Sequence, residues 1–309
     1  MIVFITGTSR GLGRFLKQRL VQRGYTVVGC SRAPAQGSDD LRLDVTDASA
    51  CEDALRWIKQ RHGRIDAVVN NAGYHLVGAA LETTPEELRA QMELNFFGSV
   101  NVLRAAVPLM IEQRAGRLVN VGSIGGVLAS PFAAAYNASK FALEGYEAAL
   151  RAECAPFGVH VSNLTPAFVR TGTHGRSLVA TRGEHALFSP HRMKVLRHME
   201  AGGEKGVPME AVARALERTL SARQPRFHDS VDGLAARLAL LRVLMPQRMF
   251  EAIVVRNTAP GWPEAATRSL PNPSNRSGTL TLQPPRREPD GTPLRPAPQA
   301  GMRRRGHPH

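Results

Sequence analysis

The chain has 309 residues, of which 43% are hydrophobic and 21% charged, an ordinary composition for a globular protein with a sizeable core. Its net charge is +14, but the basic residues are spread along predicted helices and no nucleic-acid-binding motif is present, so we expect no nucleic-acid partner. Three scattered cysteines fit neither a disulfide framework nor a metal site, and neither a signal peptide nor an uninterrupted apolar run of about 18 residues is found, so we expect a cytoplasmic, reducing setting and no bound metal.

Short runs rich in valine and isoleucine alternate with helical stretches in the first half of the chain. The runs predicted as buried strands are bounded by Gly or Asn and lie at residues 2–6, 26–30, 67–70, 117–121 and 159–164. Helical periodicity is found at residues 13–23, 48–62, 85–110 and 136–154. This alternation predicts an α/β fold in which helices cover both faces of a doubly wound parallel sheet, the Rossmann fold.

The pattern changes after Pro166. A polar stretch at 172–207 precedes a predicted helix at 208–222, and a helical extension rich in Leu and Arg follows at 234–245. From residue 258 to 309, Pro, Arg, Ser and Gly dominate, with eight arginines against three acidic residues, and such a segment cannot bury enough apolar surface to offset chain entropy. We therefore expect a single domain at 1–257 with a C-terminal helical extension, followed by a disordered basic tail at 258–309.

A glycine-rich turn follows the first predicted strand and opens the first predicted helix. At such a place free N–H groups at the helix N-terminus face a pyrophosphate, and glycine lets the backbone approach it closely. The strand before the turn and the helix after it are the context that the motif needs. We expect this turn to bind a dinucleotide through Gly7, Thr8, Ser9, Arg10, Gly11, Leu12 and Gly13.

The residues after the second predicted strand indicate which dinucleotide is bound. In dinucleotide-binding folds an acidic residue about 20 positions beyond the glycines holds the ribose hydroxyls and selects NAD. Here Ser31 and Arg32 stand at this place instead. A guanidinium fits a 2′-phosphate bidentately, and Arg10 in the glycine turn offers a second cation. We therefore expect NADP(H) to be preferred, with NAD(H) possible.

A candidate catalytic group lies around residue 136. Tyr136 and Lys140 share one face of a predicted helix, and Ser123 follows the strand at 117–121, at the edge of the sheet where ligands bind. The unperturbed pKa of tyrosine is about 10, and a nearby ammonium group lowers it by stabilising the phenolate. The Tyr136/Lys140 pair is therefore expected to act as a general acid/base.

Residues 1–222 resemble the short-chain dehydrogenase/reductase family, because the glycine turn, Asn70-Asn71-Ala72-Gly73, Ser123 and the Tyr136/Lys140 pair occur in the family's order. The resemblance implies that Tyr136 delivers or removes the hydroxyl proton while Ser123 holds the substrate oxygen. Lys140 is expected to lower the pKa of Tyr136 and to bind the nicotinamide ribose. Asn95 is expected to complete a catalytic tetrad through a proton-relay water. A homodimer or homotetramer, formed through the helices at 95–110 and 136–154, is also implied.

The resemblance implies further cofactor contacts. Asp44 and Val45, after the family's third strand, match the pair that contacts adenine. The segment 166–171 is similar to Pro-Gly-x-Val-x-Thr, with Ala167 in place of the glycine, and its threonine meets the carboxamide. The cofactor-binding residues expected by resemblance are therefore Asp44, Val45, Asn71, Ala72, Gly73, Tyr136, Lys140, Pro166, Val169 and Thr171.

Substrate specificity is expected to lie at 172–207, a loop-and-helix lid over the nicotinamide. Its apolar residues line a pocket or belong to the core: Leu178, Val179, Leu187, Phe188, Met193, Val195, Leu196 and Met199. Its histidines, His185, His191 and His198, are irregularly spaced and expected to be solvated.

The region 225–256 is similar to the C-terminal extension of family members that act on steroids, retinoids or other lipophilic carbonyls. Helical spacing relates Leu234, Leu238, Leu241 and Met245, with Arg237, Arg242 and Arg248 nearby. Such a basic amphipathic helix can lie on an anionic membrane. We favour packing over the substrate pocket or against another subunit over this peripheral membrane contact.

We therefore expect an NADP(H)-dependent oxidoreductase that transfers a hydride between nicotinamide and the carbonyl or alcohol carbon of a lipophilic small molecule. Two alternatives stay open. One is a 3-oxoacyl-thioester reductase, for which the basic surface would receive an acidic carrier protein. The other is a non-catalytic NADP-binding regulatory protein, which would bind NADPH without turnover.

Overall fold

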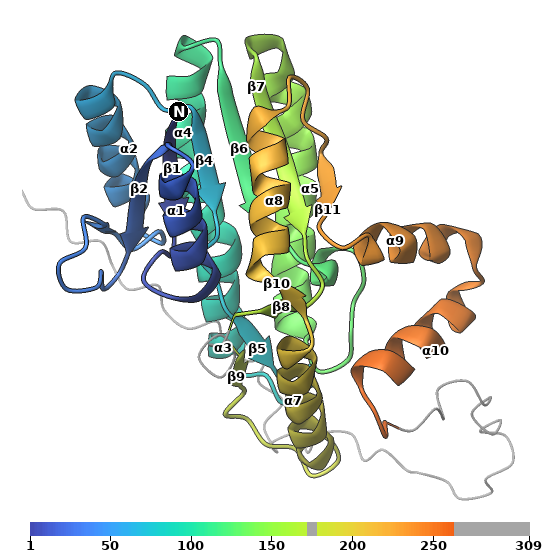
Figure 1. Ribbon diagram of the computed structural model, residues 1–309. Coiled ribbons are helices and arrows are strands. Elements are labelled where there is room, and N and C mark those ends of the chain that lie inside the picture. The colour runs from blue at the N-terminus through green and yellow to red at the C-terminus, as the bar shows by residue number, and fades with distance from the viewer. Residues whose placement is uncertain (172–177, 263–309) are drawn as a thin grey trace, which may run out of the picture. The chain divides into compact units, whose positions relative to one another are not determined.

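The computed structural model describes residues 1–171 and 178–262, and its centre is a seven-stranded sheet (Figure 1). The strand order is β11-β7-β6-β4-β1-β2-β3, and every neighbouring pair is parallel. The strands are β1 (Ile2–Thr6), β2 (Thr26–Ser31), β3 (Leu41–Arg42), β4 (Ala67–Asn70), β6 (Gly116–Val121), β7 (Val159–Thr165) and β11 (His228–Ser230). The doubly wound parallel sheet expected from the sequence is confirmed.

The strand order reverses between β1 and β4. After β1 the chain builds β2 and β3 on one side, and it then returns to place β4 on the other side of β1. Loops that leave a parallel sheet at such a switch point diverge and open a crevice at the carboxyl edge. Gly7 follows β1 and Asn71 follows β4, so both stand at this crevice.

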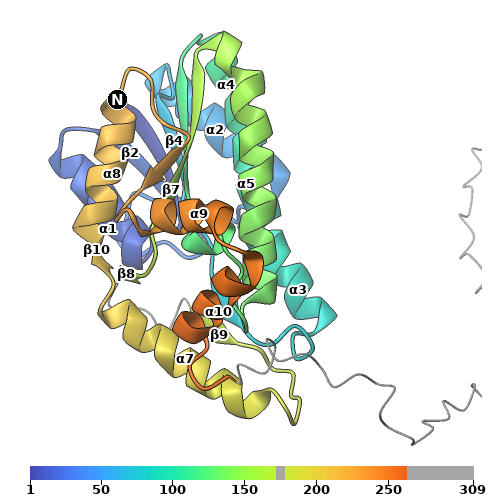
Figure 2. The same ribbon diagram turned by 90° about the vertical axis from the view of Figure 1, so that its right-hand side faces the viewer.

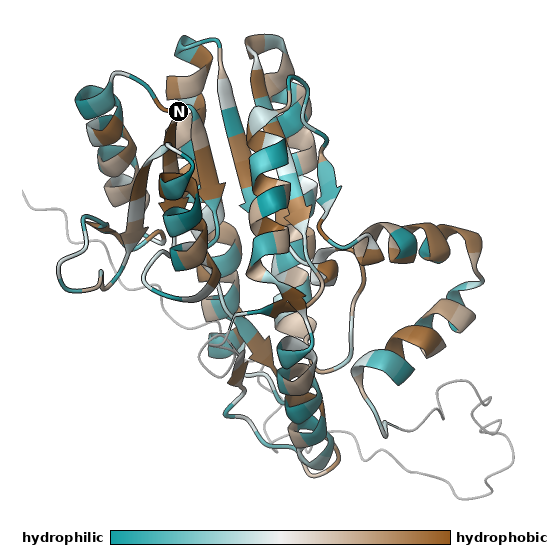
Figure 3. Cartoon of the chain, viewed as in Figure 1, coloured by the Kyte–Doolittle hydropathy of each residue, from teal (hydrophilic) through white to brown (hydrophobic). Residues whose placement is uncertain are grey.

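Helices cover both faces of the sheet because its strands are apolar on both sides (Figures 1 and 2). In β1, Val3 and Ile5 pack toward α1 and α8, whereas Phe4 packs toward α2, α4 and α5. Burying each such large side chain contributes roughly 1.5–3 kcal/mol. The covering helices are α1 (Gly11–Gln22), α8 (Met209–Ser221), α2 (Ala48–His62), α4 (Gly98–Glu112) and α5 (Ala134–Cys154). Figure 3 shows the hydrophobic strands enclosed between helices whose outer faces are hydrophilic.

The helix predicted at 85–110 is interrupted. It consists of α3 (Pro85–Met92), a π-helical turn η1 (Glu93–Phe97) and α4. A capping box starts it, in which the Thr84 side chain and the N3 residue Glu87 satisfy each other's backbone N–H groups. The π turn contains Asn95, and extra residues of this kind are frequent at functional sites. Apolar periodicity did not reveal the turn, because its five residues are too few to show a change of period.

The stretch Pro85–Glu112 as a whole is long and apolar enough to cross a membrane, judged by length and composition alone. Half of its most apolar window is buried inside the protein, where Val102, Leu103 and Met110 belong to the core. A core helix of a globular domain meets the same criterion, so this stretch is only weak support for a membrane span.

Four short strands outside the central sheet were not predicted from the sequence. Two small parallel sheets pair β5 (His75–Val77) with β9 (Leu178–Ala180) and β8 (Val169–Arg170) with β10 (Val207–Pro208), and α7 (Ser189–Glu204) lies between them in sequence. Strands of two or three residues are too short to show an alternating pattern. A buried ion pair, Arg192 to Glu82 at 3.1 Å, joins α7 to the loop before α3. The described part of the predicted lid is therefore tied to the domain, while residues 172–177 lie outside the described residues.

The three histidines of this region, expected to be solvated, are half-buried. The His191 ring packs edge-on against Trp262, the His185 ring lies 4.9 Å from that of Phe188, and His198 Nε2 is 2.8 Å from the Asn257 carbonyl oxygen. They are covered because the segment around Trp262 folds back onto α7, a contact between distant residues that local composition does not report.

The C-terminal part ends in two helices, α9 (Leu234–Leu244) and α10 (Gln247–Thr258), which form an arm beside the sheet (Figures 1 and 2). The predicted domain end at residue 257 falls too early, because Ala259 is 1% exposed and Trp262 packs against Phe132 and Phe188. The tail from residue 263 onward lies outside the described residues.

The apolar stripe predicted on α9 is correct only in part, since Leu238 and Met245 are half-buried. Leu234 and Leu241 are 42% and 38% exposed, whereas Ala235 and Leu238 face the domain. The helix is apolar nearly all round, so spacing alone did not identify its packed face.

Candidate active site

Two adjoining pockets form one crevice at the carboxyl edge of the sheet. The first has a volume of about 290 Å³ and lies over the glycine turn, and the second, of about 220 Å³, lies over the ends of β6 and β7. Four residues line both: Leu12, Asn71, Gly73 and Thr171. Together the two pockets offer room for a ligand with two chemically different ends.

The glycine turn has a shape that other residues would prevent. Gly7 and Gly11 have φ values of 75° and 53°, in the left-handed region that favours glycine. A Cβ atom on Gly13 would come 2.2 Å from the Gly7 carbonyl oxygen and 2.4 Å from Asn71 Nδ2. The turn therefore folds tightly onto the start of α1 and leaves a cradle that fits a pyrophosphate at the helix N-terminus.

Asn71 and Ala72 brace this turn from the end of β4. The backbone N–H groups of both donate to Thr6 Oγ1, at 2.9 and 3.0 Å. Asn71 Nδ2 also donates to the carbonyl oxygens of Thr6, at 2.9 Å, and Gly7, at 3.3 Å. These bonds join β1 to β4 across the switch point.

The predicted ligand residue Thr8 is an exception. Its side chain is buried, donates to the Asp40 carboxylate and the Cys30 carbonyl oxygen, and does not line the pocket. The backbone N–H of Thr8 also donates to the Cys30 carbonyl oxygen, at 3.1 Å, so the predicted contact of Thr8 with the cofactor is not supported at this position.

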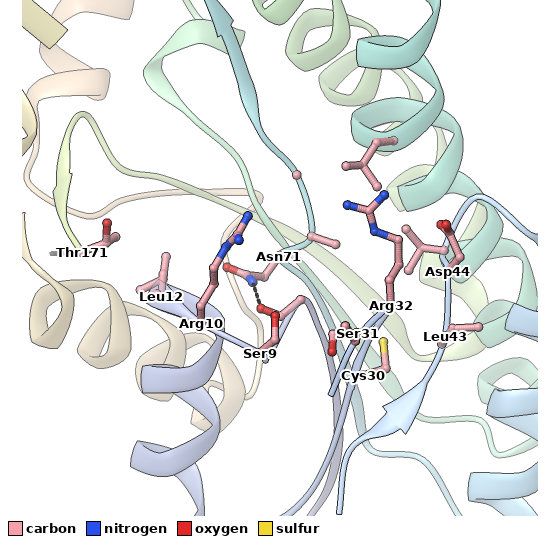
Figure 4. A pocket seen from close by; sticks show the side chains of 18 residues that line it. Ser9, Arg10, Leu12, Cys30, Ser31, Arg32, Leu43, Asp44, Asn71 and Thr171 are labelled. Carbon is pink, nitrogen blue, oxygen red and sulfur yellow. Dashed lines mark hydrogen bonds between the residues drawn. The ribbon is translucent and has the colours of Figure 1, made fainter. Parts of the chain in front are cut away.

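Both predicted arginines line the first pocket. Figure 4 shows Arg10 and Arg32 extending in the same direction, with Ser9 and Ser31 between their bases. Asp44 is the one acidic residue among the lining residues, and its Oδ1 accepts from the Thr46 N–H and hydroxyl at 3.1 and 2.9 Å. The other predicted residues that line this pocket are Gly7, Gly11, Leu12, Gly13, Val45, Asn71, Ala72 and Gly73.

Asp40 supplies a carboxylate near the glycine turn that sequence spacing did not indicate. Its side chain is 3% exposed, forms an ion pair with Lys17 and does not line the pocket. Because Lys17 pairs with the Asp40 carboxylate outside the pocket lining, the open side of the pocket keeps the positive charge of Arg10 and Arg32.

The catalytic candidates meet in the second pocket, which Asn95, Ser123, Tyr136 and Lys140 line together. Ser123 acts on the Tyr136 hydroxyl, because it opposes the rise in the pKa of Tyr136 that burial causes. Ser123 Oγ also accepts from the Gly125 N–H at 3.0 Å, and Lys140 Nζ donates to the Val121 carbonyl oxygen at 3.0 Å. The end of β6 and the first turns of α5 thus hold three reactive side chains in one place. Pro166, Val169 and Thr171 line the same pocket, as expected.

The electrostatics differ from the expectation that Lys140 lowers the pKa of Tyr136. Burial raises the pKa of Tyr136 above 10, opposed by the hydrogen bond from Ser123, and burial lowers the pKa of Lys140 to about 8. The expected lowering is absent because the Lys140 ammonium is bonded to Val121 and lies 5.9 Å from the centre of the phenol ring. Tyr136 is therefore protonated at neutral pH in this state.

Asn95 lines the same pocket but is engaged by the protein. Its Nδ2 donates to the Tyr74 carbonyl oxygen at 2.9 Å and to Ser139 Oγ at 3.2 Å, and its Oδ1 accepts from the Tyr74 N–H at 3.1 Å. Ser139 Oγ in turn donates to the Tyr136 carbonyl oxygen at 2.7 Å. Asn95 therefore fixes the first turn of α5, and its part in a water relay stays a prediction.

His75 was not identified from the sequence, although it lines the pocket. Its ring is stacked on that of Tyr136, and burial together with the Lys140 charge lowers the pKa of His75 to about 3. Among the described residues its buried Nε2 has no hydrogen-bond partner. The imidazole is thus neutral and open to a ligand. Its position two residues after Gly73 was the available signal, and spacing does not report ring stacking.

Apolar side chains close the far side of this pocket. Phe168, Val169 and Met199 line it beside the reactive hydroxyls. Of the predicted specificity residues, Met199 and Val195 are buried, with Phe188 and Leu196 packed against the same cluster. Val179, Leu187 and Met193 are instead 42%, 72% and 44% exposed.

A buried acidic pair lies one and two turns beyond Lys140 on α5. Asn163 Nδ2 donates to Glu144 Oε2 at 2.7 Å and to Glu147 Oε2 at 2.8 Å. Burial and the neighbouring Glu144 raise the pKa of Glu147 well above its usual range. Glu147 opposes the lowering of the pKa of Lys140 that burial causes.

Sequence comparisons agree with this geometry. The family model described as short chain dehydrogenase matches residues 1–179. A 3-ketodihydrosphingosine reductase of Bacteroides thetaiotaomicron is 34% identical over 255 residues, covering 81% of this chain and 95% of that protein. Retinol dehydrogenase 5 of Mus musculus is 31% identical over 283 residues, covering 82% of this chain and 87% of that protein.

Solved structures show the same architecture. A short-chain dehydrogenase from Streptomyces avermitilis superposes with a TM-score of 0.69 at 31% identity, covering 79% of this chain and 94% of that one. A short chain dehydrogenase from Burkholderia cenocepacia in complex with NADP has a TM-score of 0.65 at 25% identity, covering 84% of this chain and 98% of that one.

Proposed function

The chain belongs to the short-chain dehydrogenase family, and on that basis we propose that it is an oxidoreductase that transfers a hydride between NADP(H) and the carbonyl or alcohol carbon of a lipophilic small molecule. The observation that carries the proposal is the convergence of Ser123, Tyr136 and Lys140 in one pocket that adjoins the glycine cradle.

The side chains at the end of β6 and the start of α5 have separate roles in the proposed reaction. Nicotinamide, when bound in the crevice, supplies or accepts the hydride. Ser123 and Tyr136 hold the substrate oxygen between them, and Tyr136 donates the proton in the direction of reduction, because its raised pKa keeps it protonated at neutral pH. When its ammonium turns from the Val121 carbonyl oxygen toward the phenol, Lys140 stabilises the negative charge that then develops on the tyrosine oxygen.

The preference for NADP(H) rests on Arg10 and Arg32. Their guanidinium groups line the open side of the first pocket, while the nearby Asp40 carboxylate is paired with Lys17 outside the lining. A 2′-phosphate fits such a cationic site, and Asp44, the acidic residue among the described lining residues, accepts from Thr46 through Oδ1. The NADP complex of the Burkholderia cenocepacia relative supports this choice.

A lipophilic substrate is supported by Phe168, Val169 and Met199, which line the pocket beside the hydroxyl pair. Two relatives, 3-ketodihydrosphingosine reductase and retinol dehydrogenase 5, are named for lipophilic substrates that carry a ketone or an alcohol. We therefore place the substrate among long-chain or polyisoprenoid carbonyls and their alcohols.

The test is NADPH oxidation with 3-ketodihydrosphingosine, all-trans-retinal and a small polar ketone in parallel. The proposal predicts turnover of a lipophilic carbonyl and little with the polar ketone. A thioester reductase would instead turn over 3-oxoacyl groups better on their carrier protein than as free ketones. A regulatory protein would bind NADPH and turn over nothing in a broad carbonyl panel, which would refute the proposal.

A further inference from the structure

The helix α9 is apolar on two opposite faces. Its inner face packs through Ala235 and Leu238 toward the domain, and Arg242 donates to the Val127 carbonyl oxygen at 2.7 Å. The outer face carries Leu240, Val243 and Leu244, which are 59%, 81% and 69% exposed. Because they are three and four residues apart, these side chains form one stripe on the helix.

Such a helix is normally buried on all sides. In Figure 3, α9 is hydrophobic along most of its length although it stands outside the sheet and its covering helices. On α10, Met249 adds an apolar side chain that is 56% exposed. Together Leu240, Val243, Leu244 and Met249 make up an uncovered apolar surface, here called the arm surface.

Positive charge surrounds the arm surface. Arg237 lies one turn before Leu240 and two turns before Leu244 on the same side of α9, and Arg248 and Arg256 are exposed on α10. The sequence of α9 contains no acidic residue, and α10 contains one, Glu251, whose carboxylate accepts from Gln247 Nε2 at 2.7 Å. The occupant of this surface must therefore tolerate apolar contact and carry negative charge.

We propose that the arm surface docks on an anionic phospholipid bilayer, with its apolar side chains among the lipid chains and its arginines at the phosphates. Apolar residues flanked by arginines on an exposed helix have the chemistry of an interfacial membrane helix. A second copy of this chain fits less well, because a two-fold contact brings the same surface together and opposes arginine to arginine.

Docking at this place also orients the active site. The inner face of the arm contacts Val127 and Leu128, which lie in the segment between Ser123 and Tyr136. A cavity of about 500 Å³ lies there, lined by Leu128, Pro131, Phe250 and Val254 among others. If the proposed function holds, the bilayer is the reservoir of the lipophilic substrate. Docking itself does not depend on that function.

The test is sedimentation of the full chain with vesicles of phosphatidylcholine alone and of phosphatidylcholine mixed with phosphatidylglycerol. The wild type should bind the mixed vesicles and bind pure phosphatidylcholine weakly. Replacing Leu240, Val243 and Leu244 by serine should weaken binding at least about tenfold, since the inserted apolar surface is lost. Replacing Arg237, Arg248 and Arg256 by glutamine should weaken it on the mixed vesicles by roughly fivefold for each arginine.

Two matched variants isolate the arm. Serine at Val21, Leu81 and Leu187 removes comparable exposed apolar surface elsewhere and should leave binding unchanged. Glutamine at Arg303, Arg304 and Arg305 removes the same charge from the tail and should weaken binding less than the arm variant. All variants should keep wild-type NADPH affinity, which shows that they fold and requires no substrate.

Three outcomes overturn the proposal. Unchanged vesicle binding of the leucine and valine variant is one. Loss of binding in the tail variant alone is another. The third is concentration-dependent self-association, abolished by the arm variants, in a protein that does not bind mixed vesicles.

Discussion

The imidazole ring of His75 lies face to face on the phenol ring of Tyr136, with 3.8 Å between the ring centroids and 7° between the planes. This stack holds the proposed proton donor from the side of β5, while Ser123 holds its hydroxyl. A neutral imidazole is the form that suits this buried place, because a charged ring would face the Lys140 ammonium without a compensating acid. The position of Tyr136 thus depends on an element that local sequence did not indicate.

The protonation of His75 predicts how stability depends on pH. Its pKa falls from 6.5 in the unfolded chain to about 3 in the folded one, so between these values the unfolded state binds more protons. The stability that the neutral ring allows is present above pH 6.5 and is lost as the pH falls toward 3. At pH 5 this loss is about 2 kcal/mol.

The variant His75→Phe, which keeps a stacked ring and removes the titration, should lose correspondingly less stability between pH 7 and pH 5. Urea unfolding of both proteins at the two pH values measures the difference. Equal losses in the two proteins would show that His75 is not the buried neutral group described.

Cofactor choice predicts the behaviour of Arg32→Asp. Removing the guanidinium and adding a carboxylate should weaken NADPH binding roughly 10- to 100-fold, because a charge-assisted hydrogen bond to the 2′-phosphate is lost and a repulsion is gained. NADH binding should be unchanged or tighter. Arg14→Asp, an exposed position on α1 outside the pocket lining, makes the same charge change and should have little effect. Unaltered NADPH affinity in Arg32→Asp, measured by fluorescence titration, would refute the phosphate contact.

The glycine cradle is tested by Gly13→Ala. The added Cβ would meet the Gly7 carbonyl oxygen at 2.2 Å, and since this neighbour is backbone, the turn must shift. NADPH affinity should fall by at least about tenfold, and stability by roughly 1–3 kcal/mol. Gly145→Ala on α5 meets nothing within 4 Å and should be neutral or stabilising. The cradle assignment fails if both variants bind NADPH like the wild type.

Lys140 predicts the alkaline limb of the pH–rate profile for carbonyl reduction. Its pKa is about 8 because of burial, so the ammonium that stabilises the tyrosine oxygen is lost as the pH rises above this value. The value of kcat/KM for NADPH, which reports the free enzyme, should be level near pH 7 and fall about tenfold per pH unit above about 8. NADPH affinity measured over the same range separates binding from chemistry. A level profile up to pH 10 would contradict the assignment.

Much of the sheet and the site was predictable from local sequence. The bounds of β1 and β4 agree with prediction because their apolar runs end at glycine or asparagine. The parallel topology then brings the residues that follow these strands, such as Gly7 and Asn71, to the same edge of the sheet. These features depend on residues close in sequence, or on a crossover rule that leaves few alternatives.

The rest depends on contacts between distant residues. Thr8 turns away from the pocket because Asp40 reaches it from another loop, and His75 stacks on Tyr136 from sixty-one positions earlier. Burial raises the pKa of Tyr136, and Lys140 does not offset this rise because it bonds to Val121, a partner that helical spacing does not reveal. On α9, uniform apolarity concealed which face is packed.

The most direct test of the proposed function is the loss of NADPH absorbance with a lipophilic carbonyl, compared between the wild type and Tyr136→Phe. The variant keeps the stack on His75 and lacks only the hydroxyl, so NADPH affinity should be unchanged while kcat falls by roughly 10²–10⁴. Turnover in Tyr136→Phe equal to that of the wild type would contradict the account.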